Sequence, residues 1–413
     1  MARAKAVVIM AAGKGTRMKS SVTKVLHPVA GRPMIHYPVR SALDLGAEKV
    51  VVVLGHQSDA VEAYLGQAFP GAPITGALQT EQLGTAHAVL CAREALDGFS
   101  GDIFILSGDV PTLPTNVIRR LDEDAGDAVV AVLGMRLEEP AAYGRLVRDS
   151  RGSLGAIVEA ADCSKDQLSI DEVNAGVYRV DSEHLFSTLD TLSTENAQGE
   201  YYLTDIVASA AQSNLPVSVT LLEGDEAPLA GGVNDRIDLA AAERRQQKAL
   251  RDGLMRGGVT LNDPESLFLH DGVIVGQDTV IEQGVALLGE TQIGDGCYVE
   301  QGTRILDSRI GQGTRIKAAS HLESANVGDR CQVGPFARLR EGTVLDEDVK
   351  VGNFVETKKA HLEPGAKASH LSYIGDARVG AAANIGAGTI TCNYDGYRKF
   401  KTDIGAGAFI GSD

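Results

Sequence analysis

Residues 275–316 read VGQDTVIEQGVALLGETQIGDGCYVEQGTRILDSRIGQGTRI, and an aliphatic residue returns at nearly every sixth position. The series comprises Val275, Ile281, Leu287, Ile293, Val299, Ile305, Ile310, Ile316, Leu322, Val327, Val333, Leu339, Leu345 and Val351. An α-helix needs apolar residues three and four positions apart, and a half-buried strand needs alternation, so neither explains this period. A parallel β-helix does, because each hexad supplies a short strand and a corner, with the aliphatic side chain inside the column. The alternative is a loop-rich β-sandwich in which the spacing arises by chance.

The composition indicates a globular protein of two or three domains. Its 413 residues carry a net charge of −16, which disfavours non-specific binding to nucleic acid or to an anionic membrane. The five cysteines are scattered and form no Cys-x-x-Cys pair, so we expect a reducing, cytoplasmic location without disulfides or a zinc site. We expect no membrane helix, since no apolar run approaches about 18 residues. We also expect no signal peptide, since the chain enters a strand-like segment at once.

A glycine-containing loop follows the first strand-like segment, Ala6–Met10. It runs from Ala11 to Met18 as AAGKGTRM. Open α/β sheets bind nucleotide phosphates at such strand ends, where glycines let backbone N–H groups approach the oxyanions. Lys14, Arg17 and Lys24 would add positive charge. The Walker pattern is absent, and the dinucleotide fingerprint lacks its third glycine. The alternative is a purely structural turn.

Strand-like and helix-like segments alternate over the next 90 residues. We expect helices at Pro33–Leu45, Asp59–Leu65 and Thr85–Ala95, and strands at Lys49–Leu54 and Ile103–Leu106. This βαβ rhythm favours a doubly wound parallel sheet.

Two polar segments accompany these elements. Asp109 follows the second of those strands and is placed to hold Mg²⁺ against phosphate oxygens, unless it only caps a turn. The segment Gln79–Thr85 could read a base edge or simply cap a helix.

Polar and glycine positions continue toward the coil. Gly144, Glu159 and Asn174 lie beside strand-like segments and could bind sugar hydroxyls, although each could be structural. Asn234 is expected to cap a charged, alanine-rich helix that ends near Met255 at two glycines. We therefore expect a domain over residues 1–230, a linker helix over 231–258 and the coil over 259–413.

The hexad rhythm is interrupted at Glu356–Tyr373, which predicts a loop on a binding face. The interruption holds Lys358, Lys359, His361, His370 and Tyr373, and Arg338 and Arg340 lie about one coil earlier. A neutral histidine among cations favours an anion site with a base, although a lone histidine is more often structural. A second interruption, Cys392–Tyr397, could line a neighbouring pocket.

These motifs together resemble one family. The segments AAGKGTRM with Lys24, Asn196–Asp205, GPFARLR at 334–340, GNFV at 352–355 and Ile385–Asp395 are similar to those of the bacterial bifunctional N-acetylglucosamine-1-phosphate uridyltransferases / glucosamine-1-phosphate acetyltransferases. The resemblance runs nearly end to end. It implies a Rossmann-like nucleotidyltransferase domain, a left-handed β-helix and a cytoplasmic homotrimer. The implied activity supplies UDP-N-acetylglucosamine for peptidoglycan and lipopolysaccharide.

The resemblance also implies residue roles. For uridyl transfer, the nucleotide would contact Met10, Ala11, Ala12, Gly13, Gln79, Gly84 and Thr85, beside Ser107, Gly108 and Asp109; the sugar would contact Gly144, Glu159 and Asn174; Mg²⁺ would bind Asp109 and Asn234; Lys24 and Arg17 would neutralise the phosphates. For acetyl transfer, Arg340 and Lys358 would bind the sugar phosphate, His370 would be the base, Tyr373 and Asn384 would position the sugar, and Ala387, Asn393, Tyr394 and Ser412 would meet acetyl-CoA. The small-molecule partners would be UTP, N-acetylglucosamine 1-phosphate, glucosamine 1-phosphate and acetyl-CoA.

Two departures from the family pattern follow. Thr23 stands where the family usually has proline before its loop lysine, which predicts a more mobile loop with its charge kept. The family continues past the position of Asp413, so we expect a complete uridyltransferase and an incomplete acetyl-CoA site. The competing interpretations are another sugar-1-phosphate nucleotidyltransferase whose β-helix is only structural or regulatory, and a scaffold without turnover.

Overall fold

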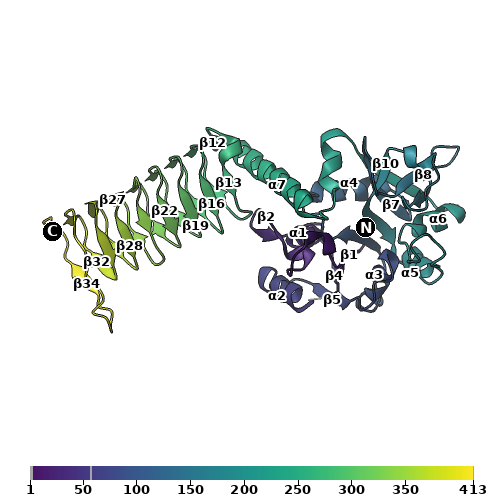
Figure 1. The fold of residues 1–413 in the computed structure, drawn as a ribbon, viewed down its shortest axis with the longest axis horizontal. Coiled ribbons are helices and arrows are strands. Elements are labelled where there is room, and N and C mark those ends of the chain that lie inside the picture. Colours follow the sequence, from purple (N-terminus) through teal and green to yellow (C-terminus); the bar gives the residue numbers. More distant parts are fainter. Residues whose placement is uncertain (1–2, 56–57, 413) are drawn as a thin grey trace. The chain divides into compact units, whose positions relative to one another are not determined.

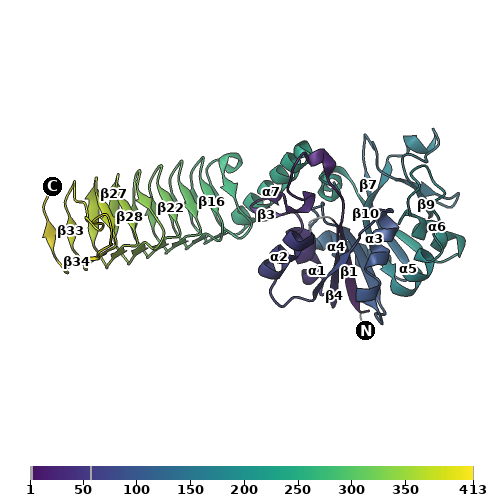
Figure 2. The same cartoon turned by 60° about the horizontal axis from the view of Figure 1, so that its bottom comes forward.

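The computed structural model describes residues 3–55 and 58–412. The chain forms two compact units, Met1–Arg245 and Gln246–Asp413. The first is an α/β unit and the second is a stack of short parallel strands (Figures 1 and 2). In the described ranges no helix is both long and apolar enough to cross a membrane. All five cysteines are free in this structure.

The first unit is built on one mixed sheet with strand order β11-β7-β10-β6-β1-β4-β5. Its strands are β1 (Lys5–Ala11), β4 (Lys49–Leu54), β5 (Ile74–Leu78), β6 (Asp102–Ser107), β7 (Val130–Arg136), β10 (Glu172–Asp181) and β11 (Val217–Leu222), with β8 (Arg145–Arg148) and β9 (Leu154–Val158) at one side. A separate small pair joins β2 (Pro28–Val29) to β3 (Arg32–Pro33).

The prediction of a parallel sheet is correct for β6, β1, β4 and β5 but wrong for β10, which runs antiparallel to both β6 and β7. Parallel neighbours require a long crossover, usually a helix. The chain between β7 and β10 instead forms the antiparallel β8–β9 pair and a short 3₁₀ turn (Gln167–Ser169). The return strand therefore enters the sheet in the opposite direction.

Helices cover both faces of this sheet because its central strands are apolar on both sides. Along β1, Val7 and Ile9 pack in one cluster with α1 (His36–Asp44), α2 (Ser58–Ala68) and α4 (Thr115–Ala125). Ala6 and Val8 pack in the other with α3 (Thr85–Cys91), α5 (Ser182–Leu189) and α6 (Asp205–Gln212). The doubly wound architecture is thus confirmed. The predicted helix starting at Pro33 begins later, at His36, because Pro33 belongs to β3.

Helix α7 (Arg236–Arg256) contains the boundary between the two units, and Gly257-Gly258 follow its last residue. Its first part belongs to the α/β unit, where Glu243 accepts a hydrogen bond from Ala30 N at 2.7 Å. The prediction that Asn234 caps this helix is wrong. Asp235 is the cap, since its carboxylate accepts from Ile237 N at 2.8 Å and Asp238 N at 3.0 Å.

The second unit stacks three parallel sheets, one for each side of the coil. The first contains β12 (Thr260–Leu261), β15 (Val280–Ile281), β18 (Tyr298–Val299), β21 (Arg315–Ile316), β24 (Gln332–Val333), β27 (Lys350–Asn353), β30 (Lys367–His370), β33 (Asn384–Ile385) and β35 (Phe409–Ile410). The second contains β13 (Phe268–Leu269), β16 (Ala286–Leu288), β19 (Arg304–Leu306), β22 (His321–Glu323), β25 (Arg338–Leu339), β28 (Glu356–Lys358) and β31 (Tyr373–Gly375). The third contains β14 (Ile274–Val275), β17 (Gln292–Ile293), β20 (Arg309–Ile310), β23 (Asn326–Val327), β26 (Val344–Leu345), β29 (His361–Leu362), β32 (Ala377–Val379) and β34 (Thr402–Ile404).

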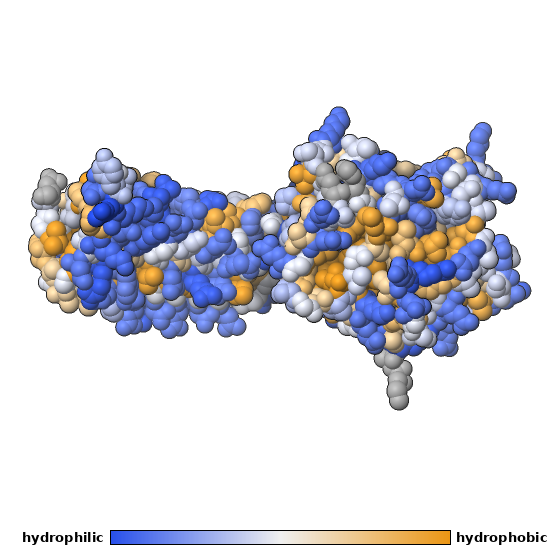
Figure 3. Space-filling model, turned by 90° about the horizontal axis from the view of Figure 1, so that it is seen from below, coloured by the Kyte–Doolittle hydropathy of each residue, from blue (hydrophilic) through white to orange (hydrophobic). Residues whose placement is uncertain are grey.

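The hexad prediction is confirmed, and the stack is consistent with a left-handed β-helix. The aliphatic residues of the series from Ile281 to Val351 lie in one buried column, while the face of the stack drawn in Figure 3 is mostly hydrophilic. The predicted loop at Glu356–Tyr373 is wrong, because strands β28 to β31 continue the stack in register. Buried Thr357 and Ala368 occupy the inward positions there, so the rhythm changes only in residue type.

The loop that does leave the coil lies later, where Asn393–Phe400 forms a projecting hairpin with a bridge between Tyr394 and Lys399 (Figure 1). It coincides with the second predicted interruption, Cys392–Tyr397.

Candidate active sites

The loop after β1 is held close to its neighbours by glycines. Gly15 has φ of +59°, and a Cβ there would lie 2.6 Å from Lys24 Cβ. Gly55, at the end of β4, leaves room for the carbonyl of Ala12; a Cβ would approach that oxygen to 2.5 Å. Any side chain at either position would displace the loop or Lys24. The predicted phosphate loop therefore lies at the carboxyl edge of the sheet.

Four predicted residues meet at this edge. The Lys24 ammonium forms an ion pair with Asp109 and contacts Asn234 Oδ1 at 3.2 Å. Arg17 donates to the same amide oxygen at 3.0 Å. Ser107 Oγ donates to the other Asp109 oxygen at 2.7 Å, which fixes the carboxylate. Because Asp235 caps α7, the Asn234 amide oxygen is available to these cations.

The donor set at this edge fits a magnesium ion. One carboxylate and one amide oxygen, from Asp109 and Asn234, converge on a single cation, the Lys24 ammonium. Mg²⁺ prefers oxygen ligands and commonly takes one or two protein carboxylates together with substrate phosphates. Within residues 3–55 and 58–412, no group of three His, Cys, Asp or Glu side chains forms a metal cluster. The protein alone therefore supplies only part of a coordination shell.

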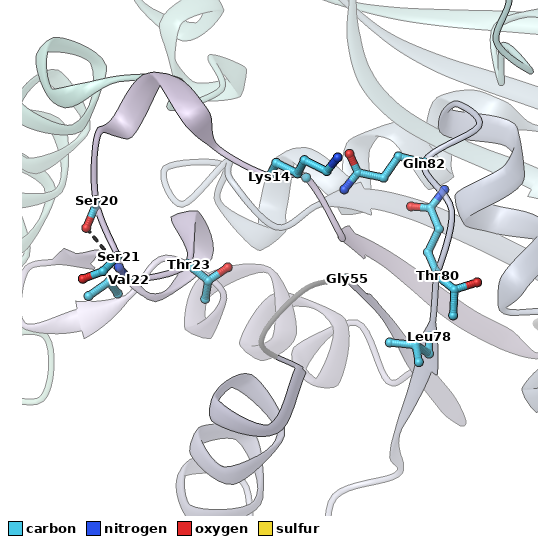
Figure 4. A pocket seen from close by; sticks show the side chains of 11 residues that line it. Lys14, Ser20, Ser21, Val22, Thr23, Gly55, Leu78, Thr80 and Gln82 are labelled. Carbon is cyan, nitrogen blue, oxygen red and sulfur yellow. Dashed lines mark hydrogen bonds between the residues drawn. The ribbon is translucent and has the colours of Figure 1, made fainter.

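A pocket of roughly 620 Å³ opens beside the loop (Figure 4). Gly13 and Gln79 are predicted residues that line it, together with Lys14, Ser20, Ser21, Val22, Thr23, Gly55, Leu78, Thr80 and Gln82. Gln82 Nε2 donates to the carbonyl of Ala12 at 2.7 Å, so this side chain ties the far wall to the loop.

The predicted nucleotide contacts Gln79, Gly84, Thr85 and Met10 take part in hydrogen bonds and close backbone contacts around the pocket. Gln79 Nε2 donates to Gly84 O at 3.3 Å, and Thr85 Oγ1 accepts from Leu203 N at 3.0 Å. Gly84 has φ of +116°, and a Cβ would lie 2.4 Å from Tyr201 O. Met10 O accepts from Gly108 N at 2.9 Å, which joins β1 to the start of the Asp109 turn. These residues are brought together, but several are held by structural hydrogen bonds.

The three predicted sugar contacts also lie together. Asn174 N donates to Gly144 O at 2.8 Å, and a Cβ on Gly144 would be 3.4 Å from the Glu159 carboxylate. Asn174 is itself tied to Tyr178, whose hydroxyl accepts from the amide at 2.6 Å. Burial raises the pKa of Glu159, and Asp162, Asp205 and Glu200 raise it further, against a lowering hydrogen bond from Thr204. Glu159 is therefore a partly desolvated acceptor.

On the coil, the predicted acetyl-transfer residues gather around one corner. Arg340 follows β25, Lys358 ends β28, and Tyr373 begins β31 in the same sheet. His370 ends β30 in the adjacent sheet, three residues before Tyr373. Asn384, however, begins β33 opposite Lys367, at the other end of the strand that His370 ends.

The predicted acetyl-CoA contacts occupy the later turns. Ala387 and Ser412 each lie two residues past register partners, Ile385 and Ile410, so they occupy equivalent positions on successive turns. Asn393 donates to Asp376, and Tyr394 is exposed on the projecting hairpin, its hydroxyl donating to Gly396 O at 2.6 Å.

Sequence reasoning missed the roles of two residues in these sites, Gly55 and Glu356. Gly55 lines the pocket and could have been found as a glycine at the end of a parallel strand, whereas Gln82, which also lines it, belongs to the predicted segment Gln79–Thr85. Glu356 pairs with Arg340 at 2.8 Å, a contact that follows from the 18-residue register between β25 and β28. Without the register of the strands, the pairing could not be inferred.

Comparison with known proteins agrees with this layout. Residues 7–166 match the family described as a MobA-like NTP transferase domain, and residues 269–369 match the GMPPB C-terminal domain. The chain is 50% identical over 408 residues to the bifunctional protein GlmU of Anaeromyxobacter sp. (strain Fw109-5), covering 99% of this chain and 83% of that protein. It is 48% identical over 411 residues to GlmU of Pelobacter propionicus, covering 99% and 88%. GlmU of Geotalea uraniireducens is 45% identical over 411 residues, covering 99% and 89%.

Proposed function

The chain belongs to the family of bifunctional GlmU proteins, and on that premise we propose that it makes UDP-N-acetylglucosamine by two transfers at separate sites. Glucosamine 1-phosphate is first acetylated from acetyl-CoA on the coil. N-acetylglucosamine 1-phosphate then receives UMP from UTP on the α/β unit, with release of pyrophosphate. The observation that carries the proposal is the convergence of Lys24, Arg17, Asp109 and Asn234 at the carboxyl edge of the sheet.

Uridyl transfer requires charge neutralisation and alignment more than a covalent nucleophile. The sugar phosphate oxygen attacks the α-phosphorus of UTP, and the bond to the pyrophosphate oxygen breaks. Lys24 and Arg17 reach the same oxygen of Asn234 and so can both turn toward phosphate oxygens. The pocket beside Gly13 and Gln79 would hold the nucleoside, and Glu159 would accept hydrogen bonds from sugar hydroxyls.

Magnesium is part of this proposal. Asp109 and Asn234 would hold the ion, which when bound supplies positive charge against the phosphates. Lys24 would then leave the carboxylate and serve the phosphates itself. Two other contacts keep Asp109 oriented without Lys24. The Ser107 hydroxyl donates to its carboxylate, and Val233 N donates to Asp109 O at 2.9 Å.

Acetyl transfer would use the corner around His370. The amine of glucosamine 1-phosphate needs a base as it attacks the thioester, and the neutral imidazole can take the proton. Arg340 and Lys358 would bind the phosphate and Tyr373 would position the sugar at this corner, whereas Asn384, the other residue assigned to the sugar, lies at the far end of β30. Ala387, Asn393, Tyr394 and Ser412 would meet acetyl-CoA.

We further propose that the protein is a cytoplasmic homotrimer. An exposed apolar edge on the coil supports contact with another copy: Phe336, Phe354 and Leu371 are 53%, 55% and 61% exposed, at successive turns of one corner. The two phenylalanine rings stack at 5.4 Å. All three residues have positive φ, which favours glycine, so bulky side chains there are held at a conformational cost.

The competing proposal is a sugar-1-phosphate nucleotidyltransferase whose β-helix is only structural or regulatory. Two assays separate them: pyrophosphate release from UTP, and thiol release from acetyl-CoA, each with glucosamine, N-acetylglucosamine and glucose 1-phosphates. Bifunctionality predicts thiol release with glucosamine 1-phosphate and pyrophosphate release with N-acetylglucosamine 1-phosphate. Pyrophosphate release that prefers glucose 1-phosphate, without thiol release, would support the competitor.

A further inference from the structure

Strands β27 and β30 place Asn353 directly beside His370. Both are four-residue strands, whereas the other described strands of the coil have two or three. The extra length makes Asn353 and His370 register partners at the ends of the pair. Gly352 permits the close approach, because a Cβ there would lie 1.9 Å from Ser369 O. Leu371 N then donates to Asn353 O at 3.1 Å and fixes the corner.

The side chains of these partners are joined by a hydrogen bond of 2.8 Å between Asn353 Oδ1 and His370 Nδ1. An amide oxygen can only accept, so Nδ1 must carry the hydrogen. A neutral imidazole has one N–H, and the lone pair is therefore on Nε2. The ring is exposed, and within the described ranges no protein group hydrogen-bonds Nε2.

We propose that Asn353 is the positioning residue for His370, holding it in the tautomer whose Nε2 accepts the proton of the substrate amine. This inference rests on the acetyl transfer proposed above. As the amine nitrogen forms its bond to the thioester carbonyl carbon, its proton passes to Nε2. The carbon–sulfur bond then breaks, and the thiolate leaves and takes a proton.

An amide suits this role better than a carboxylate would. A carboxylate beside the ring would stabilise the imidazolium and remove the base near neutral pH, whereas an amide orients the ring without adding charge. The strands packed against β30 bring Lys350 from β27 and the neutral Asn384 from β33, both opposite Lys367 at the far end. Beyond the corner lie Tyr373 and the Arg340–Glu356 ion pair.

Two other histidines of the coil show the contrast. His361 Nε2 lies 2.9 Å from the Asp346 carboxylate, so its partner is an anion and its Nε2 is occupied. His321 Nε2 accepts from Arg304 at 2.9 Å, so its Nε2 lone pair is occupied. Of these three rings, His370 alone has a neutral hydrogen-bond acceptor on Nδ1 and an open Nε2.

The first test is the tautomer itself, by ¹⁵N NMR of histidine-labelled protein at a pH where the ring is neutral. We expect His370 to show a protonated Nδ1 and an unprotonated Nε2, and we expect Asn353→Ala to shift the population toward protonated Nε2. A wild-type ring protonated on Nε2 would overturn the inference, whatever the enzyme's activity.

The second test is the pH profile of thiol release. Asn353→Ala should lower kcat roughly tenfold to a hundredfold with little change in KM, because the base is present but misaligned. Asn353→Asp should recover activity at high pH, with its acid limb moved up by about one pH unit, because the carboxylate stabilises the imidazolium. If Asn353 had a purely structural role, both variants would lose kcat to the same extent and the acid limb of the pH profile would not move. That result would refute the inference.

The matched control is Asp346→Asn, which changes the partner of His361 and should leave both readouts at His370 unchanged. Failure of the proposed function is recognised separately. If His370→Ala keeps full thiol release while the wild-type ring shows the expected tautomer, acetyl transfer by this base is wrong, and Asn353 orients a ring with no part in it. If the wild-type protein releases no thiol, the NMR result alone decides the positioning.

Discussion

The buried pair Thr343 and Thr357 offers a sharp test of how the coil is stabilised. Their hydroxyls lie 2.9 Å apart, and the side chains are 1% and 0% exposed. Thr357 stands between Leu339 and Ile374 in the inward column, where the series would otherwise place an aliphatic residue. Each hydroxyl satisfies the other in an apolar surrounding.

Replacing one threonine of the pair by valine keeps the side-chain shape but leaves the other hydroxyl without its hydrogen-bond partner. A buried polar group without a partner costs about 1–3 kcal/mol, whereas replacing both partners by apolar groups is nearly neutral. We therefore expect Thr343→Val and Thr357→Val each to destabilise the coil by that amount. The double variant should lie within about 1 kcal/mol of the wild type. The coupling between the two sites should exceed about 1 kcal/mol.

Native-state hydrogen exchange is the suitable assay, because a chain of two units need not unfold in one step. The amides of Arg340 and Val344, which donate to Thr357 O and Ala360 O at 2.9 and 2.8 Å, report the opening of these turns. If the single variants match the wild type, or if the double variant loses the sum of the two singles, the hydroxyl pair is not a coupled hydrogen bond. Thr303→Val is the control, since among the described residues its hydroxyl has one hydrogen-bond partner, the backbone carbonyl of Lys317 at 3.4 Å.

The other predictions concern catalysis. Lys24→Ala should lower uridyl transfer roughly 10²–10³-fold, the loss typical of one preorganised charged donor; pyrophosphate release measures it, and unchanged thiol release shows that the fold is intact. Because burial raises the pKa of Glu159, its carboxylate protonates at a higher pH than an ordinary glutamate. KM for N-acetylglucosamine 1-phosphate should therefore rise as pH falls through that pKa, and a Glu159→Gln variant that kept this pH dependence would contradict the role. His370→Ala should lose about 10²–10⁴-fold in thiol release, as expected for a removed base, with pyrophosphate release as the control; full retention would exclude it as the base.

The sequence predicts much of the coil because its periodicity is directly imposed by packing. Each aliphatic residue of the series faces the same column, so spacing alone locates the strands. The prediction of a loop at Glu356–Tyr373 was wrong because it required a large aliphatic residue at every inward position. Thr357 and Ala368 fill inward positions without being large aliphatics, because a paired hydroxyl or a small side chain can also be accommodated.

The α/β unit is less predictable because direction and pairing are tertiary properties. The apolar run that became β10 looks like any buried strand, and only the β8–β9 pair before it sets its antiparallel direction. The meeting of Lys24, Asp109 and Asn234 spans more than 200 residues and follows from the shared edge of the sheet. The Asn234 amide oxygen can join this group because Asp235, and not Asn234, caps helix α7. Sequence patterns do not resolve which of two adjacent residues is the cap.

The ammonium of Lys24 already contacts one Asp109 carboxylate oxygen and the Asn234 amide oxygen, the two groups that would hold a divalent ion. Without nucleotide the enzyme should bind free divalent cations weakly, because each cation must displace the Lys24 ammonium from these oxygens. A triphosphate changes that competition by attracting the lysine to itself. Metal and nucleotide should consequently arrive as a single complex, and saturation should follow the concentration of magnesium-bound UTP rather than that of either component alone.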